Sequence, residues 1–428
     1  MKSSAAALPP QIPGAPSQTG AAEKNDKLAG LIARRRPGWS LEQDFYNDPG
    51  IFDLDMARVI GRNWLFAGLS LQAPKPGDYF TWQLGKEPLL IIRGQDGILR
   101  AWFNVCTHRG SRICSEESGN KKVLVCPYHQ WAFDPEGHLK NSRHMPEGFD
   151  RSAFGLHGLQ LREVGGLIFV CLAEQAPVFE EFEEGLRRHL LPYDLANAKI
   201  AEYSHFSVRA NWKLVVENFR ECYHCGGNHP EYCGAVISAI SPDVPELAKV
   251  EESLNAEKAA RWKAMGLDVQ THWFSDASWF LFWRFPLQPG FISLTRDGKP
   301  VAPLLGSLQD RDIGVLAVTT APQFWMEMSS DHCMIIRMTP VSADVTDLDF
   351  YWLVRGDALE GNDYQVDEVT AVWKATGTQD VRLCEVNQAG VNSSAYRPGP
   401  YSQVEGGTET FVQWYLNQMQ TQEYTHGR

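Results

Sequence analysis

Hydrophobic residues change their spacing along the chain, and the changes divide it into segments of different secondary structure. Over residues 41–64 apolar side chains recur at near-helical spacing, which predicts a helix with Ser40 as its N-cap. From residue 77 to 171 the pattern changes to short alternating runs punctuated by glycine and proline, such as those at 79–84, 89–92 and 166–170. Such runs indicate strands joined by turns. We therefore expect a small all-β domain, bounded at residues 60–172.

The second half of the chain mixes two periodicities. Residues 179–191, 212–225 and 361–389 have helical spacing, and the last of these predicts a long helix. Between residues 273 and 340 aromatic residues alternate with β-branched residues, which is typical of antiparallel strands. An antiparallel sheet flanked by helices is an α+β arrangement, and α+β is the fold class that we expect for the whole chain.

The length of the chain predicts two domains, because 428 residues exceed what one hydrophobic core usually serves. Residues 1–37 are predicted to be a disordered leader, since their start is rich in alanine, serine, proline and glycine without the apolar stretch of a signal peptide. Residues 38–59 and 173–428 then form the larger domain, with the all-β domain inserted between them.

Composition narrows the classes of function. The net charge of −12 argues against a nucleic-acid partner and against an anionic membrane surface. The chain lacks an apolar run of about eighteen residues, so we expect no membrane span and a cytoplasmic protein. An odd number of cysteines, nine, does not suggest a disulfide framework. Apart from two cysteines in the motifs described next, we expect free and largely buried thiols at Cys114, Cys171, Cys222, Cys225, Cys233, Cys333 and Cys384.

Two Cys/His pairs stand in the all-β segment, Cys106-Thr-His108 and Cys126-Pro-Tyr-His129, with seventeen residues between them. Two thiolates and two imidazoles are the ligand set of a Rieske [2Fe-2S] cluster. A structural zinc ion is the alternative. Zinc sites more often pair C-x₂-C with H-x₃₋₅-H, whereas here each half supplies one Cys and one His, which favours two irons with different ligands.

A second set of candidate ligands follows in residues 218–229. If the helix at 212–225 is continuous, Asn218, Glu221 and His224 share one of its faces. Gly226-Gly227 would end that helix and turn His229 back toward His224. Two histidines and a carboxylate form the facial triad of non-heme Fe(II) oxygenases. The spacing alone is a weak signal, and it does not choose among the acids of the long helix, Asp363, Asp367, Asp380 and Glu385.

These motifs resemble those of a known family. Cys106-Thr-His-Arg-Gly110, Cys126-Pro-Tyr-His-Gln-Trp131 and Asn-x₂-Glu-x₂-His-x₄-His resemble the large (alpha, terminal oxygenase) subunit of Rieske non-heme iron oxygenases, over about residues 41–418. The resemblance implies a catalytic domain of helix-grip, START-like type. It implies Cys106, His108, Cys126 and His129 as cluster ligands, and His224, His229 and Asp380 as ligands of mononuclear Fe(II).

The resemblance also implies how the subunits cooperate. Glu221 stands where the commonest family pattern has Asp, and it would link a cluster histidine of a neighbouring subunit to His224 in a homotrimer. Electrons would come from a separate flavin and iron-sulfur reductase. No G-x-G-x-x-G motif opens a strand-to-helix unit, so NAD(P)H and flavin are expected only on that partner. An electron carrier without oxygenase activity is an alternative, but it would leave the second ligand set unexplained.

The Glu221 variant, with the segment Tyr396–Ser402, resembles the branch that oxidises quaternary ammonium compounds such as glycine betaine, stachydrine and carnitine. This branch implies O₂-dependent hydroxylation or N-demethylation. Oxygenation of an aromatic compound is the alternative. A methylammonium group favours an aromatic cage, although aromatic residues in strands more often form core. The candidates are Trp273, Phe274, Trp279, Phe280, Phe282, Trp283, Phe285, Phe324 and Trp325.

Overall fold

The computed structural model describes residues 18–420, and its first half contains a small β domain. Its three sheets have strand orders β4-β3-β2-β5, β6-β7-β8 and β1-β10-β9. The strands are β1 (Leu65–Leu69), β2 (Asp78–Leu84), β3 (Glu87–Arg93), β4 (Leu99–Phe103), β5 (Ser118–Asn120), β6 (Leu124–Val125), β7 (Ala132–Phe133), β8 (Leu139–Asn141), β9 (Gln160–Val164) and β10 (Leu167–Cys171). The strands predicted from alternation at 79–84, 89–92 and 166–170 are confirmed.

Both faces of β3 are buried, and this places the two Cys/His loops. Leu89 and Ile91 pack with residues of β1 and β10. Leu90 and Ile92 point to the opposite face, because successive side chains of a strand alternate. There they pack in a second cluster that contains Cys106 and Cys126. The central sheet therefore carries the loops on the face turned away from β1 and β10.

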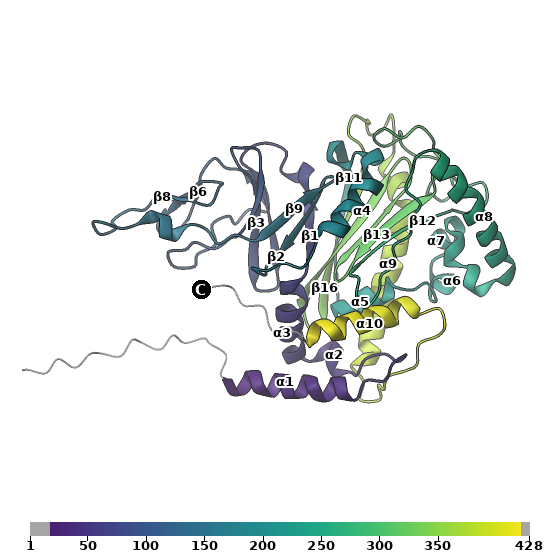
Figure 1. Cartoon of the computed structure of the whole chain (residues 1–428), viewed down its shortest axis with the longest axis horizontal. Coiled ribbons are helices and arrows are strands. Elements are labelled where there is room, and N and C mark those ends of the chain that lie inside the picture. Colours follow the sequence, from purple (N-terminus) through teal and green to yellow (C-terminus); the bar gives the residue numbers. More distant parts are fainter. Residues whose placement is uncertain (1–17, 421–428) are drawn as a thin grey trace, which may run out of the picture.

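The larger domain is built on a six-stranded antiparallel sheet with the order β11-β16-β15-β14-β13-β12. Its strands are β11 (Ala198–Val208), β12 (Phe280–Phe285), β13 (Val315–Thr320), β14 (Phe324–Met328), β15 (Cys333–Ser342) and β16 (Val345–Arg355). The helices that follow the β domain are α4 (Glu180–Leu190), α5 (Trp212–Asn218), α6 (Cys225–Asn228), α7 (Pro230–Ala235), α8 (Pro245–Ala264), α9 (Val366–Val391) and α10 (Gly406–Met419). The α+β prediction is confirmed (Figure 1).

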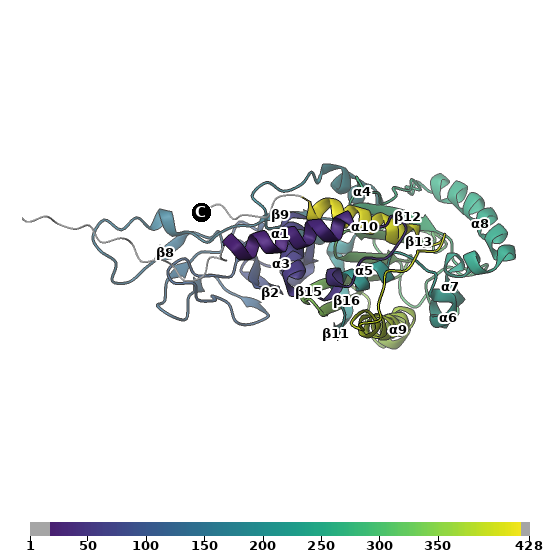
Figure 2. The same ribbon diagram turned by 90° about the horizontal axis from the view of Figure 1, so that it is seen from below.

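Helix α9 lies against this sheet, seen nearly end-on in Figure 2. Gly377, near its middle, faces Phe350 of β16, and a Cβ atom at this position would lie 2.7 Å from the Phe350 ring. Ordinary side chains cannot approach so closely. The absence of a side chain at Gly377 thus permits the close contact of helix and sheet.

The N-terminal helices belong to the larger domain, and they correct two predictions. A leader over 1–37 is wrong for residues 18–33, which form α1 (Gln18–Ala33) and bury Leu28 and Leu31 on one face; residues 1–17 lie outside the described part. The helix predicted over 41–64 is interrupted. It divides into α2 (Asp44–Asn47) and α3 (Pro49–Arg58), because Pro49 lacks an amide hydrogen and disfavours helix before it.

Further differences concern helix ends and missed elements. Ser40 is not an N-cap, because the first helix after it begins at Asp44 and has Gln43 at the N-cap position. The helix predicted over 212–225 ends at Asn218. Strands β11 and β16 and helices α8 and α10 were not predicted; α8 buries only Trp262, so its apolar periodicity is weak. Among the described residues, no helix has the length and apolar character that a bilayer span requires.

A buried charge pair joins α3 to α5. The Lys213 ammonium contacts the Asp55 carboxylate, and both side chains are fully buried. Asp55 also accepts hydrogen bonds from the Tyr415 hydroxyl of α10, at 2.6 Å, and from the Trp212 indole, at 3.0 Å. One carboxylate therefore connects three helices that are distant in the sequence.

Replacing Asp55 with Asn should lower the free energy of unfolding by about 3–5 kcal/mol, because the Lys213 charge would remain buried without a counter-charge. Denaturant titration of the variant measures this loss. Asp53→Asn is the matched control: Asp53 forms an exposed pair with Lys24, and its loss should cost less than about 1 kcal/mol. Equal effects of the two substitutions would contradict the anchoring role.

Candidate functional site

The two Cys/His loops share one backbone construction. In the first, the Gly110 amide donates to the Cys106 carbonyl at 2.9 Å, and in the second the Gln130 amide donates to the Cys126 carbonyl at 3.0 Å. The residue that closes each loop has a positive φ, +78° at Gly110 and +60° at Gln130. Each cysteine amide then donates to a carbonyl just beyond its own loop, at 2.8 Å. Two equivalent turns therefore present the four side chains.

These loops bring the four predicted cluster residues together. The His108 and His129 rings have centroids 4.7 Å apart, and Trp131 stacks on His108 at 4.6 Å. Cys106 and Cys126 are buried. Burial raises the pKa of the Cys106 thiol to about 11, and the adjacent Cys126 adds to the rise. The His108 Nδ1 atom is buried without a hydrogen-bond partner. Two buried sulfurs and two partly exposed imidazoles, one of them with a buried and unpaired nitrogen, are a donor set that fits a [2Fe-2S] cluster.

The second site assembles at the junction of α6, α7 and α9. His229 Nε2 lies 3.0 Å from Asp380 Oδ1, and His224 Nε2 lies 3.4 Å from the same oxygen. His229 and Asp380 are buried, and His229 Nε2 has no hydrogen-bond partner. Two imidazole nitrogens and one carboxylate oxygen thus point to one location, as a facial metal triad requires.

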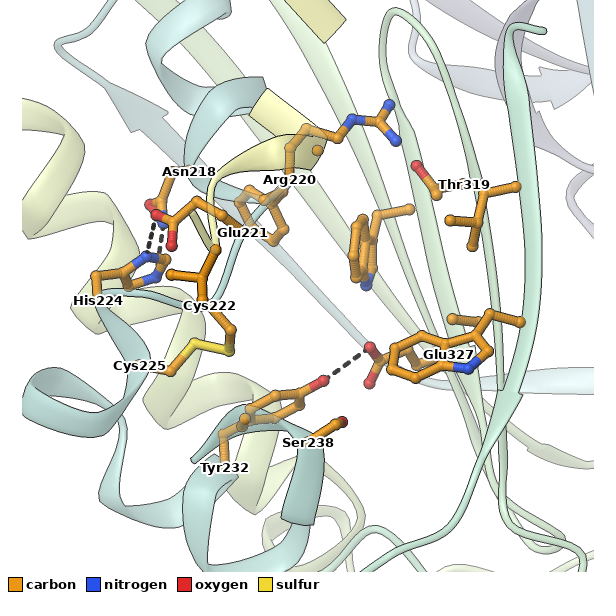
Figure 3. A pocket seen from close by; sticks show the side chains of 18 of the residues that line it. Asn218, Arg220, Glu221, Cys222, His224, Cys225, Tyr232, Ser238, Thr319 and Glu327 are labelled. Atoms are coloured by element: carbon orange, nitrogen blue, oxygen red, sulfur yellow. Dashed lines mark hydrogen bonds and ion pairs between the residues drawn. A yellow bond between two sulfur atoms is a disulfide. The ribbon is translucent and has the colours of Figure 1, made fainter. Parts of the chain in front are cut away.

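Neighbouring residues orient both imidazoles through their other nitrogen. His224 Nδ1 lies 2.6 Å from Glu221 Oε1, and His229 Nδ1 lies 2.8 Å from Gln379 Oε1. Figure 3 shows Asn218 and Glu221 pointing toward His224. Such hydrogen bonds fix the ring orientation so that Nε2 faces a metal. The role of Gln379, one residue before Asp380, could not be predicted from the sequence. Helical spacing does not indicate a contact with His229, which is 150 residues away.

The negative charges around these histidines favour a cation. Burial lowers the pKa of His224, but Asp380 and Glu221 outweigh this effect and raise its pKa to about 9. The pKa of His229 is lowered by burial and raised more strongly by Asp380, with a net rise. The carboxylates therefore attract positive charge to the two Nε2 atoms, a proton or a metal ion alike.

The local backbone differs from the continuous helix that the spacing suggested. After α5 ends at Asn218, residues 219–224 form turns, and Gly226 and Gly227 lie inside α6. The Asn218 amide group contacts both His224 Nε2 and Asp380 Oδ1, and Glu221 accepts a hydrogen bond from the Tyr223 amide. Side chains that bond locally compete with helical backbone bonds. The residues converge through these turns and not along one helical face.

Cys222 and Cys225 correct the expectation of free thiols. Their Cα atoms are 4.9 Å apart, within the usual range for bridging, and the two residues form a disulfide beside His224 (Figure 3). Cys225 lies close to both histidines. Because its sulfur is bonded to Cys222, Asp380 is the better third ligand. The other five expected free thiols are free and buried.

A cavity of about 490 Å³ opens beside this second site, with His224, His229 and Asp380 in its wall. Of the nine aromatic candidates, four line it: Trp273, Phe274, Trp283 and Trp325. Trp279, Phe280, Phe282, Phe285 and Phe324 are absent from its lining and pack in the hydrophobic cores. Alternation along β12 explains why Trp283 lines the cavity and Phe282 does not, while Phe285 is on the same face as Trp283 but lies beyond the cavity and packs in the core.

Two charged residues of the wall were not predicted. Glu327 of β14 is buried and accepts a hydrogen bond from the Tyr232 hydroxyl at 2.9 Å. Arg220 follows α5 and donates to the Thr320 carbonyl at 3.1 Å. The sequence did contain one sign of Glu327: it is an acid in the otherwise apolar strand Phe-Trp-Met-Glu-Met.

A second hollow of about 420 Å³ lies on another side of Glu221. Glu221, Asn218 and His224 line both spaces, and the second hollow also contains Tyr401 and Cys384. Strand β6, which immediately precedes the second Cys/His loop, and β8 of the same sheet lie at the opposite end of the molecule from α6 and α7 (Figure 1). The two candidate metal sites of one chain are therefore at separate ends of it.

Comparisons with known families agree with this division. Residues 63–161 match the Rieske [2Fe-2S] domain, and residues 195–421 match the catalytic domain of the ring-hydroxylating alpha subunit. Both candidate sites lie within the matched ranges.

Similar proteins cover nearly the whole chain. The glycine betaine monooxygenase oxygenase subunit of Chromohalobacter salexigens is 39% identical over 401 residues, 93% of this chain and 90% of the relative. The carnitine monooxygenase oxygenase subunit of Escherichia coli is 33% identical over 210 residues, 48% of this chain and 56% of the relative. A crystal structure of the quaternary ammonium Rieske monooxygenase CntA has a TM-score of 0.70 at 23% identity, with 91% of this chain and 98% of that chain covered, and supports the fold.

Rieske oxygenases use a [2Fe-2S] cluster, a mononuclear iron and O₂, and the two matched domains place this chain among them. The chain belongs to the Rieske-type ring-hydroxylating oxygenase alpha subunits, and it is an oxygenase.

Proposed function

We propose that this chain is the terminal oxygenase of a multicomponent system that hydroxylates or N-demethylates a quaternary ammonium substrate. One observation carries the proposal: His224, His229 and Asp380 converge in the wall of a cavity that is also lined by four tryptophans and two phenylalanines. Aromatic faces attract a methylammonium cation. The names of the glycine betaine and carnitine monooxygenase subunits support the same substrate class.

We assign Cys106, His108, Cys126 and His129 to the cluster, and His224, His229 and Asp380 to the mononuclear iron. The cluster supplies electrons one at a time, and the iron is where O₂ is activated. The chain contributes orientation and enclosure: Glu221 and Gln379 hold the two imidazoles by their Nδ1 atoms. The aromatic side chains of the wall would limit the access of water to the reacting carbon of a bound substrate.

The assembly that best supports this chemistry is a closed ring, a homotrimer. The β6 and β8 end of one chain lies far from its own α6 and α7, so the cluster of one chain would serve the iron of its neighbour (Figure 1). The hollow beside Glu221 offers a docking place for the neighbour's loop. Tyr128, next to His129, is 57% exposed and would be buried there. A head-to-tail contact that closes gives a ring.

Glu221 is the proposed bridge between the two centres, because it holds His224 and reaches the docking hollow. A flavin and iron-sulfur reductase would supply the electrons, as the family resemblance implies. An electron carrier without oxygenase activity is less well supported, because it has no use for the second ligand set or for the cavity.

The iron ligands can be tested by metal analysis. Asp380→Ala should empty the mononuclear site yet keep the colour and spin-resonance signal of the cluster. Gln379→Leu removes the acceptor for His229 Nδ1 and should weaken iron binding by about 10- to 100-fold. Thr378→Val is the control, because Thr378 is exposed and bonds only within α9. Full iron content in Asp380→Ala would refute the assignment.

The bridge requires a different measurement. Glu221→Gln should abolish turnover coupled to electron supply while both metal centres remain bound, since an amide cannot replace the carboxylate in proton-linked electron transfer. Oxygen consumption, product yield and metal content are measured on the same preparation. Normal coupling in this variant would remove Glu221 from the route.

The substrate class can be decided by product analysis. With a surrogate reductase and O₂, the holoenzyme should release formaldehyde from glycine betaine or a related betaine. Benzoate-type compounds are the comparison. Oxygenated benzoate without formaldehyde from any betaine would favour the aromatic alternative.

A further inference from the structure

The sheet wall of the cavity is built from two rows of side chains that can be read from the strand register. Trp283 of β12 pairs with Ala317 of β13, which pairs with Glu327 of β14. The neighbouring row contains Leu281, Thr319 and Trp325. All six side chains line the cavity. Ala317 is the smallest of them, so the space between the Trp283 ring and the Glu327 carboxylate is left open.

Glu327 has one oxygen that makes no well-aligned hydrogen bond, although the indoles of Trp325 and Trp373 lie close to the carboxylate. Its Oε1 accepts from Tyr232, whereas its Oε2 is buried without a hydrogen-bond partner. Within residues 18–420 no Lys, Arg or His forms an ion pair with it. Burial raises the pKa of its carboxyl to about 7, although the Tyr232 hydroxyl and the indoles of Trp373 and Trp325 oppose the rise. A cation placed beside Oε2 would restore the ionised form and offset the cost of burial.

Arg220 presents the opposite charge. Its guanidinium packs 4.7 Å from the Phe274 centroid, and its Nε atom is buried without a partner. It has no acidic partner in the described part of the chain, and burial lowers its pKa to about 9. It reaches the sheet at Thr320, three residues along β13 from Ala317, so the two charges enter the cavity roughly 10 Å apart along the strand. Figure 3 shows them at different ends of the cavity.

We propose that Glu327 is the counter-ion of the substrate's quaternary ammonium group and that Arg220 binds its carboxylate, so that the cavity selects short zwitterionic betaines by charge at both ends. This inference rests on the proposed function and deepens it. Tyr232 lies three residues after His229, its hydroxyl donates to Glu327, and the Asp380 charge contributes to its raised pKa, so one side chain connects Glu327 to the neighbourhood of the proposed iron ligands. The N-methyl groups would then face those ligands.

The same arrangement excludes neutral substrates. An arene would fill the aromatic wall but leave the Glu327 carboxylate and the Arg220 guanidinium desolvated and unpaired. Unpaired buried charges are a strong source of discrimination. The rings of Trp283 and Trp325 would attract the ammonium group of the substrate. Glu327 and Arg220 would determine which molecules are rejected.

Binding measurements on the oxidised, reductant-free holoenzyme separate the two charges. The three probes are glycine betaine, its uncharged-head isostere 3,3-dimethylbutanoate, and tetramethylammonium, which lacks the carboxylate. The wild type should prefer betaine over 3,3-dimethylbutanoate by about tenfold or more. Glu327→Gln should remove most of that preference. Arg220→Gln should weaken betaine and 3,3-dimethylbutanoate but not tetramethylammonium.

Controls make each outcome decisive. Glu327→Met is a second charge-free variant of similar length, and Glu252→Gln changes an exposed carboxylate on α8 that should have no effect. Cluster absorbance and iron content report that each variant is folded. A folded Glu327 variant that keeps the wild-type preference would overturn the inference while leaving the proposed function intact. A wild type that binds neither onium probe would contradict both.

Discussion

The mononuclear site depends on one contact between segments that are far apart in the chain. The Asp380 carboxylate of α9 meets the Nε2 atoms of His224 and His229, which come from the turns around α6. An oxygen atom contacts the other nitrogen of each ring and orients it: a Glu221 carboxylate oxygen for His224 and the Gln379 amide oxygen for His229. Without Asp380 these groups would surround two imidazoles with no shared oxygen, and no facial triad would exist.

The contact explains why part of the site was predictable and part was not. Family resemblance proposed His224, His229 and Asp380 as ligands, and the structure brings the three side chains together. Helical periodicity could not separate Asp380 from the other acids of the same helix. The reasoning from spacing was wrong about the path: Asn218, Glu221 and His224 converge through turns. Local side-chain hydrogen bonds interrupt the helix there, and such bonds leave no periodic signal.

In the fold too, features that depend on neighbouring residues could be predicted, and features that depend on contacts between distant segments could not. Short apolar runs predicted the strands β2, β3 and β10 of the small β domain. These strands bury most of their side chains, so their apolar residues are visible in the sequence. Strand β11 was missed because it lies at the edge of the sheet and carries mixed polar residues. The aromatic candidates could not be sorted before the register was known. Once it is known, alternation assigns Trp283 and Trp325 to the cavity and Phe282 and Phe324 to the core.

The cavity and the cluster loops contain different kinds of polar group. The loops bury two sulfurs beside partly exposed imidazoles and leave one buried imidazole nitrogen unpaired. The cavity buries a whole carboxylate and a guanidinium at separate places in an aromatic wall. In both cases the protein retains polar atoms that its own groups do not satisfy. Such atoms are costly in a folded chain, and they mark where an external group completes the structure.

Gly377 has no functional group, yet it affects the position of the proposed ligand Asp380. Because this residue has no side chain, α9 can approach Phe350 closely, and Asp380 follows it by three residues on the same helix. The reach of the carboxylate is therefore set by the thickness of a helix-to-sheet layer. A larger side chain at Gly377 or a smaller one at Phe350 would change the distance between α9 and the sheet and so move Asp380. Neither residue would be found by a search confined to metal ligands.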